Sequence, residues 1–348
     1  MGRKRSSKKN PLLIIALAVV LVIGIAVIGG NVYIGSIDKA FDADSDEWIN
    51  ITIPMGESTA GIGILLEEKG IIADAGKLRL YSKIKGYDGK LKAGEYSLSP
   101  AMTMTEILTM LQSGNANTLR FTVPEGLTIV QVADLLADSG LINREKFMSL
   151  IADGNFDYPF MSELPYGENR LEGFLFPETY EVFTTAKEED ILNKMLGQFD
   201  FIFSDEYYKR AEELGYSVYE IVTIASLIER EARVDEERPL VASVIYNRLA
   251  AGQPLQIDAT VQYALGKQKE ALTYADLEID SPYNTYKVPA LPAGPICSPG
   301  QASIEAALYP AESNYYYYVL KSKNEITHNF AETYDEFLVY KSQYQNSN

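Results

Sequence analysis

An internal repeat is the feature that most constrains how this chain can fold. Ile51–Ile72 (ITIPMGESTAGIGILLEEKGII) aligns without gaps, at an offset of 70 residues, with Phe121–Ile142 (FTVPEGLTIVQVADLLADSGLI). Each copy predicts a short strand, a Pro-x-Gly turn, a helix with a Leu-Leu face and a glycine stop. The sequence therefore predicts two related α/β units, one after the other.

The similarity between the two units extends beyond these copies. Lys92–Leu98 resembles part of Glu172–Val182, and helices are predicted around Met104–Leu111 and Glu188–Leu196, with an insertion in the second unit near Gly154–Arg170. The second unit thus contains the run LEGFLFPETY at a position that the repeat already explains as structure. Its acidic residues, Glu172 and Glu178, are for this reason weaker catalytic candidates.

The N-terminal region predicts a membrane helix. Leu12–Gly30 carries no charge and approaches the roughly 20 residues that a helix needs to cross a bilayer. A basic start precedes this run and an acidic flank, 38–47, follows it, so the positive-inside rule leaves the N-terminus in the cytoplasm and the chain from about Asn31 outside. A cleaved signal peptide is the alternative, but the run is longer than a typical signal core and no clear small-x-small cleavage site follows it. The basic residues are Arg3, Lys4, Arg5, Lys8 and Lys9.

Composition excludes several function classes. Of the 348 residues, 47% are hydrophobic, and the part beyond residue 10 holds 26 basic and 48 acidic residues, a net charge of −22 that disfavours nucleic-acid binding. One cysteine, Cys297, allows no internal disulfide. One histidine, His328, is predicted at a strand end or turn, a poor setting for catalysis, and no metal-binding motif is present, so we expect neither a metal nor another cofactor.

The segment Ile221–Ala232 (IVTIASLIEREA) contains a carboxylate in an unusual position. As a helix it places Glu229 in line with the small and apolar residues Val222, Ala225 and Ser226. Burial raises the pKa of a carboxyl group, which is how a general acid is kept protonated near neutral pH. The alternative is a structural glutamate that pairs with Arg230 or Arg233, or reaches water.

The C-terminal part is predicted to be mainly helical. Helices are expected at Val218–Ala232 and Arg238–Ala250, and Asp258 is a candidate N-cap for the helix that follows it. Ser281–Gly300 holds five prolines and two glycines and predicts a rigid, extended surface segment. Asn314–Leu320 (NYYYYVL) predicts a strand, whose tyrosines serve either sheet packing or a sugar-binding platform.

Two resemblances to known families follow from these motifs. The strand, turn and helix pattern of Ile51–Ile72 resembles a LysM-type module, a βααβ fold that binds polymers of N-acetylglucosamine, although plain structural domains share the pattern. The chain from about residue 50 to 340 closely resembles the YceG-like family of endolytic murein transglycosylases. Six motifs carry that resemblance in order: LEGFLFPETY, TIASLIEREA, VASVIYNRL, LQIDATVQYALG, SPYNTY and LPAGPICSPGQASIEAALYP. Two small departures, at Ala259 and Ala293, do not touch the expected acid.

The second resemblance implies a membrane-anchored enzyme that cuts nascent peptidoglycan strands internally, with Glu229 as its catalytic acid. Such enzymes need one carboxyl group instead of a flanking pair, so Glu231, which points to another part of the helix, is not expected to act as a partner. Glu229 would protonate the oxygen between N-acetylmuramic acid and N-acetylglucosamine and then deprotonate the muramic 6-hydroxyl, leaving a 1,6-anhydro end. The expected substrate-binding residues are Ser226, Asn247, Gln256, Asp258, Tyr283, Asn284, Thr285 and Tyr286.

The predicted architecture is α+β, with one transmembrane helix, a LysM-like unit, a related second unit and a mainly helical catalytic domain with a small sheet. Two other functions remain open: a lysozyme-type hydrolase with Asp258 as second carboxylate, and a noncatalytic wall-binding scaffold for peptidoglycan synthases. The predicted segments are a cytoplasmic tail at 1–10, a membrane helix at 11–34, a linker at 35–49, a LysM-like domain at 50–117, the second unit at 118–200 and the catalytic domain at 201–348.

Overall fold

A computed structural model of the chain describes residue 24 and residues 28–30, 32–114, 118–269 and 271–347. The chain divides into two compact units, the first made of residues 1–119 and 181–185, the second of residues 120–180 and 186–348. Most of the predicted membrane helix, 11–34, lies outside the described residues. Within the described ranges no helix is both long and apolar enough to span a membrane.

The first unit is built on an antiparallel strand pair covered by helices. β1 (Ile49–Ile53) pairs with β2 (Gly94–Leu98), and α2 (Thr59–Glu68) and α3 (Ala75–Lys85) lie between them in sequence. α4 (Met104–Ser113) follows and is held at its start by a capping box of Thr103 and Glu106. Ile51 and Ile53 of β1 and the last three residues of β2 are buried, so the unit has a core of its own. Its fully buried members include Ile53, Leu66, Leu78, Tyr96, Leu98, Leu108 and Leu111.

The repeat seen in the sequence is also a repeat of structure. α5 (Ile129–Asp138) begins and ends 70 residues after α2, and the N-caps Ser58 and Thr128 have the same spacing. Both Pro-x-Gly turns place their glycine at positive φ, 80° at Gly56 and 77° at Gly126, which a side chain would disfavour. The second copy is completed by β3 (Thr118–Thr122), α6 (Arg144–Asp153), the 3₁₀ turn η1 (Pro159–Glu163), β4 (Thr179–Phe183) and α7 (Glu188–Ile202), with β3 paired to β4.

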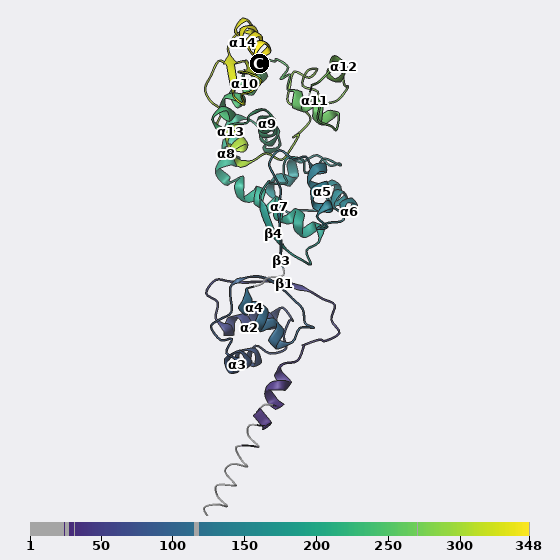
Figure 1. The fold of residues 1–348 in the computed structure, drawn as a ribbon, viewed down its shortest axis with the longest axis vertical. Helices are drawn as coiled ribbons and strands as arrows, with labels where there is room; N and C mark the ends of the chain where they lie inside the picture. Colours follow the sequence, from purple (N-terminus) through teal and green to yellow (C-terminus); the bar gives the residue numbers. More distant parts are fainter. Residues whose placement is uncertain (1–23, 25–27, 31, 115–117, 270, 348) are drawn as a thin grey trace, which may run out of the picture. The chain divides into compact units, whose positions relative to one another are not determined.

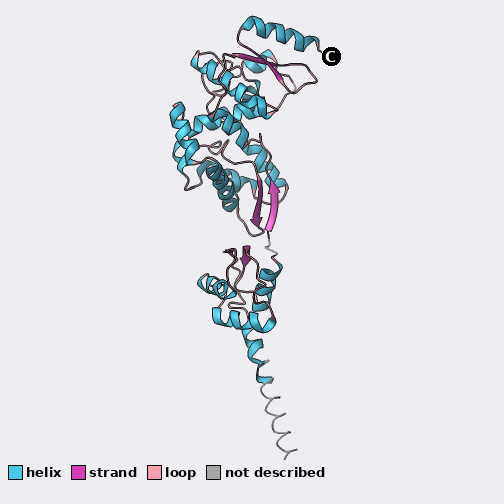
Figure 2. Ribbon diagram, turned by 90° about the vertical axis from the view of Figure 1, so that its left-hand side faces the viewer, coloured by secondary structure: helices cyan, strands magenta, loops and turns pink. Residues whose placement is uncertain are grey.

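Helices dominate the rest of the second unit (Figures 1 and 2). They surround α9 (Val218–Glu231), whose residues from Ile221 to Ile228 are all buried, as the apolar sequence requires. α9 packs against several of its neighbours, with the most extensive contact to α13. The elements are α8 (Asp205–Leu214), the 3₁₀ turn η2 (Asp235–Glu237), α10 (Arg238–Ala250), α11 (Asp258–Ala264), α12 (Tyr274–Leu277), α13 (Gln301–Leu308), β5 (Tyr317–Leu320), β6 (His328–Ala331) and α14 (Tyr334–Asn346).

The predicted class, α+β and mainly helical with small sheets, is confirmed. The helix at Arg238–Ala250 has the predicted bounds, and β5 forms the C-terminal part of the predicted tyrosine strand, paired antiparallel with β6. The description of Ser281–Gly300 as a surface segment is wrong. It contains no helix or strand, but Asn284, Thr285 and residues 294–300 are buried because the segment packs between helices.

Candidate active site

Two glutamates stand at the C-terminal end of α9 and face different surroundings. The helix begins at a capping box formed by Ser217 and Glu220, which fixes where its last turn falls. Glu229 and Glu231 are two residues apart, and side chains at that spacing project in well-separated directions from a helix. Their environments therefore decide which carboxyl group can meet a substrate.

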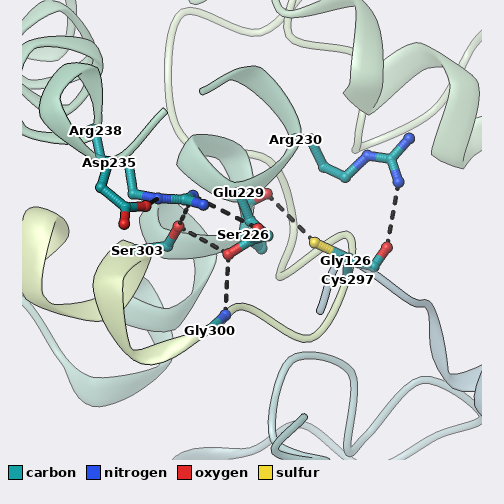
Figure 3. A network of polar contacts seen from close by, with 9 residues as sticks. All are labelled: Gly126, Ser226, Glu229, Arg230, Asp235, Arg238, Cys297, Gly300 and Ser303. Carbon is teal, nitrogen blue, oxygen red and sulfur yellow. Dashed lines mark hydrogen bonds and ion pairs between the residues drawn. The ribbon is translucent and has the colours of Figure 1, made fainter. Parts of the chain in front are cut away.

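The Glu229 carboxylate is fully engaged with the protein (Figure 3). Its Oε2 accepts hydrogen bonds from the Gly300 amide at 3.0 Å and from the Ser303 hydroxyl at 2.9 Å. Its Oε1 lies 3.5 Å from Nη1 of Arg238, and the two side chains are 8% and 10% exposed. The same Arg238 also donates to Ser303 Oγ and to Asp235. Glu229 thus joins α9 to the start of α13 through hydrogen bonds and to the start of α10 through a buried ion pair.

Glu125 lies against this ion pair and was missed in the sequence. It occupies the middle of the second Pro-x-Gly turn, where the first copy of the repeat has the 94% exposed Met55. Burial, followed by the negative charge of Glu229, raises the pKa of Glu125 above its ordinary value. Backbone bonds between Gly126 and Ser298, and between Ser298 and Leu127, hold the turn in place. The sequence did contain a signal for Glu125, because the first repeat copy has Met55 at the same position.

Glu231 instead lines a cavity of about 500 Å³. The cavity is polar at its acidic end and rich in aromatic rings on its other walls, a composition that suits sugar rings and hydroxyls. Glu231 is half-buried there, and the hydroxyl of Tyr318 donates a 3.0 Å hydrogen bond to its Oε2. The other lining residues used below are Arg248, Gln256, Asp258, Tyr286, Tyr317, Tyr334, Phe337 and Tyr344.

The environment of Glu231 favours its protonated form. Burial raises its pKa to about 7, the nearby charge of Asp258 adds to the increase, and the hydrogen bond from Tyr318 and the charge of Arg230 oppose it. A carboxyl group with a pKa near neutrality can both give and take a proton under physiological conditions. The geometry therefore favours Glu231 over Glu229 as a catalytic acid, and the sequence-based choice of Glu229 is revised.

Three predicted binding residues line this cavity. Asp258 is the first residue of α11 instead of its N-cap, which is Ile257, and its carboxylate accepts a hydrogen bond from the Tyr286 hydroxyl. Gln256 has φ +55°, a strained value for a residue with a side chain. The backbone N–H of Gln256 donates to the carbonyl of Thr285, and its side-chain oxygen accepts from Arg248. Such strain, held by surrounding bonds, is typical of functional sites.

Three other predicted residues have structural contacts. The hydroxyl of Ser226 is fully buried, bonds to Thr223 and Ile296, and has no free surface for a substrate. Asn284 and Thr285 are also fully buried. Asn284 donates to two carbonyl groups of the loop after α12, and Thr285 bonds to Ile257 and Thr260, so the two residues fix the loop that carries Tyr286. A direct substrate contact for these three buried side chains is therefore not supported.

The remaining two predicted residues lie away from Glu231. Asn247 donates to the carbonyl groups of Ser313 and Tyr315 and lines a separate cavity beside α10. The ring of Tyr283 packs against Tyr263, with 4.8 Å between centroids. The structure thus brings Gln256, Asp258 and Tyr286 together with Glu231 but leaves Asn247 and Tyr283 outside that cavity.

His328, the single histidine, is part of the packed structure. His328 begins β6, as predicted for a strand end, and is buried with Nδ1 2.7 Å from the carboxylate of Glu237. Among the described residues, no group of three or more histidine, cysteine or acidic side chains is placed to hold a metal ion.

Comparison with known proteins places the chain in a family. The model of the YceG-like family matches residues 51–343. The endolytic murein transglycosylase of Bacillus subtilis is 36% identical over 334 residues, 92% of each chain. The enzyme of the same name from Streptococcus pneumoniae strain D39 is 34% identical over 80% of this chain and 55% of its own length. A crystal structure of a YceG-like protein from Listeria monocytogenes, 35% identical, covers 85% of this chain and 99% of that chain with a TM-score of 0.56. The chain therefore belongs to the YceG-like family.

Proposed function

We propose that this protein is a lytic transglycosylase that cuts peptidoglycan strands internally, with Glu231 as its single acid and base. The family match and the relatives named endolytic murein transglycosylases support the reaction. The observation that supports the residue is the placement of Glu231, whose raised pKa coincides with a large cavity lined by aromatic rings. Glu229 has no comparable freedom, because both its oxygens are engaged.

The proposed mechanism needs two proton transfers and no cofactor. Protonated Glu231 donates its proton to the glycosidic oxygen between N-acetylmuramic acid and N-acetylglucosamine as the bond to C1 breaks. The 2-acetamido group of the substrate stabilises the positive charge that develops at C1. The Glu231 carboxylate then removes the proton of the muramic 6-hydroxyl as that oxygen attacks C1, which leaves a 1,6-anhydro end and restores the acid.

The cavity supplies the remaining parts of the mechanism. Tyr318 orients the carboxyl group of Glu231 through its hydrogen bond. Tyr286 and Tyr317 offer ring faces, and Arg248 and Gln256 offer polar groups for sugar hydroxyls. Aromatic faces with convergent polar groups are typical of ligand cavities. A strand bound across this cavity would cover C1 and keep water from it, so that the 6-hydroxyl attacks instead.

Analysis of the product ends tests the reaction. Uncrosslinked glycan strands are digested with the purified protein, and the new ends are identified by mass spectrometry. We expect 1,6-anhydro-N-acetylmuramic acid ends. Reducing ends would instead indicate hydrolysis, with water activated by a second carboxylate such as Asp258. No cleavage by a folded protein would favour the wall-binding scaffold.

The pH dependence of the reaction tests the role of Tyr318. Because Glu231 must be protonated at the start, kcat/KM is expected to fall as pH rises through about 7. The Tyr318 hydroxyl stabilises the carboxylate of Glu231, so Tyr318→Phe should raise the pKa of Glu231. The pH at which kcat/KM falls should then move upward by about one unit, since a hydrogen bond to a charged group contributes about 1.5 kcal/mol. If kcat/KM falls at the same pH in Tyr318→Phe, the protonation of Glu231 does not control the pH dependence.

Finer parts of the function extend this proposal. A membrane helix at 11–34 would hold the enzyme at the outer face of the cytoplasmic membrane, where new strands emerge, and peptidoglycan synthases are its candidate partners. The βααβ order of the first unit and the cavity beside its Pro-x-Gly turn, lined by Ser58 and Asp88 among others, fit a LysM-like glycan-binding role. Cutting strands there would end their elongation.

A further inference from the structure

We propose that a second cavity, on the other side of α11 from Glu231, binds the negatively charged stem peptide of the murein strand. This inference rests on the proposed function, since it names a further part of the same substrate. The cavity has a volume of about 280 Å³, far more than a water or a simple ion requires. Its walls are formed by Thr128, Val130, Gln131, Asn169, Glu172, Arg230, Ala259, Gln262, Tyr263, Gly266, Lys267, Gln268 and Ile296.

The cavity is positively charged in a protein whose net charge is −17. Arg230 and Lys267 both line it, and within the described ranges neither forms an ion pair with a carboxylate. Nη1 of Arg230 donates to the carbonyl of Gly126 at 3.2 Å, and its guanidinium also faces the side-chain amide of Gln268. These neutral partners position the guanidinium but leave its charge uncompensated, so an anionic ligand would be favoured here.

Among the described residues that line the cavity, the single acidic one does not cancel this charge. Glu172 is fully buried and accepts a hydrogen bond from the backbone of Ile129, with a further bond between its Oε2 and the Tyr263 hydroxyl. Burial raises its pKa to about 8, so at neutral pH it is mostly protonated. The cavity therefore presents two cations and a neutral acid to its contents.

The uncharged walls suit a peptide better than a bare anion. Four amide side chains, those of Gln131, Asn169, Gln262 and Gln268, can pair with peptide groups through both donors and acceptors. Val130, Ala259 and Ile296 add apolar surface, which would pack against small aliphatic side chains such as alanine. A stem peptide has a group to match each kind of wall: alanine methyl groups for the apolar surface, amide bonds for the amide side chains and free carboxylates for the two cations.

The position of the cavity matches the geometry of the substrate. Arg230 and Glu231 are successive residues of α9, yet Arg230 lines this cavity and Glu231 lines the other. Asp258 and Ala259 are likewise successive residues of α11, and Asp258 lines the Glu231 cavity whereas Ala259 lines this one. The two cavities therefore adjoin one end of α9 and one end of α11. A muramic acid residue bound for cleavage at Glu231 carries its peptide on the lactyl group, within reach of the neighbouring cavity.

Binding of a small probe tests this assignment directly. The probe is N-acetylmuramoyl-L-alanyl-D-glutamate, compared with its diamide, which has the same shape without the peptide carboxylates. We expect the full chain carrying Glu231→Gln to bind the charged probe about tenfold more tightly than the diamide, measured by calorimetry. Lys267→Gln should remove most of this difference. Lys209→Gln, an exposed lysine on α8, is the matched control and should leave the difference intact.

Three results would overturn the proposal. Equal affinity for the two probes would show that charge is not recognised, and an unchanged difference in Lys267→Gln would place recognition elsewhere. Tighter, Lys267-dependent binding of a glycerol phosphate oligomer would assign the cavity to an anionic wall polymer instead of a peptide. Because no probe is cleaved, these outcomes do not depend on catalysis, and failure of the proposed acid would appear only in the strand-cleavage assay.

Discussion

Replacing Glu231 by Gln is expected to lower the rate of strand cleavage by at least about 1000-fold while the protein stays folded. A positioned acid or base contributes about 100-fold to 10,000-fold. Here one group serves in both proton transfers, so the loss should fall in the upper part of that range. The glutamine keeps the shape of the side chain and can still accept the hydrogen bond from Tyr318. The measurement is the rate at which 1,6-anhydro ends form from uncrosslinked strands.

Glu229→Gln is the matched control, because it makes the same chemical change two residues earlier on the same helix. Its amide oxygen can still accept from Gly300 and Ser303, while the pairing with Arg238 is lost. We expect this variant to keep at least about a tenth of the wild-type rate, with a lower unfolding midpoint, because it removes an interaction of the scaffold instead of a reacting group. An inactive but folded Glu229→Gln, beside an active Glu231→Gln, would restore the assignment made from the sequence.

Much of the fold could be predicted because its signals are local. The alignment of the two repeat copies gave α2 and α5 their common spacing, since a capping serine or threonine, a Leu-Leu face and a glycine stop lie within some 15 residues of each other. The helix α10 was predicted for the same reason, with Pro239 in its first turn and Gly252 shortly after its end. Each of these features acts on its own segment, whatever the rest of the chain does.

The choice between Glu229 and Glu231 could not be made locally. The sequence correctly predicted that their side chains diverge, and it correctly aligned Glu229 with a buried stripe of α9. It could not show that α13, some 70 residues later, covers that stripe and supplies Gly300 and Ser303 as partners. The sequence also could not show that the hydroxyl of Tyr318 lies beside Glu231 and donates a hydrogen bond to it. The burial of Glu229 accompanies an ion pair with Arg238, whereas the structural alternative drawn from the sequence had named Arg230 or Arg233 as its partner.

The proline-rich segment, 281–300, shows that the binding residues could not be chosen from local sequence either. Five prolines predicted a rigid, extended surface segment, but the segment runs through several turns and much of it is buried, and prolines alone do not reveal whether a segment is covered. Thr285 and Asn284 were expected to bind sugar because their groups can form hydrogen bonds. In the folded protein those groups bond to the chain itself and position Tyr286 beside Asp258. Polar residue types therefore pointed to the loop that carries Tyr286, but not to which of its side chains remain accessible.

The other large effect concerns stability. Glu229→Ala removes the carboxylate that pairs with the buried guanidinium of Arg238, and it leaves the Gly300 amide without its acceptor. Removing one partner of a buried ion pair typically costs about 3 to 5 kcal/mol. Glu125 lies close enough to Arg238 for their charges to interact, and it compensates part of the loss. We therefore expect unfolding in urea to require about 3 kcal/mol less, at the lower end of the range.

Two further variants separate pairing from other losses. Glu236→Ala removes an exposed glutamate of the adjacent turn η2 and should change the free energy of unfolding by less than about 0.5 kcal/mol. Arg238→Met combined with Glu229→Met removes both charges, so the double variant should be more stable than Glu229→Met alone, because no buried guanidinium is left without the Glu229 carboxylate. If the double variant is the less stable of the two, the pairing of Arg238 with Glu229 is not what holds α9 to the start of α10, and the case for a structural Glu229 fails with it.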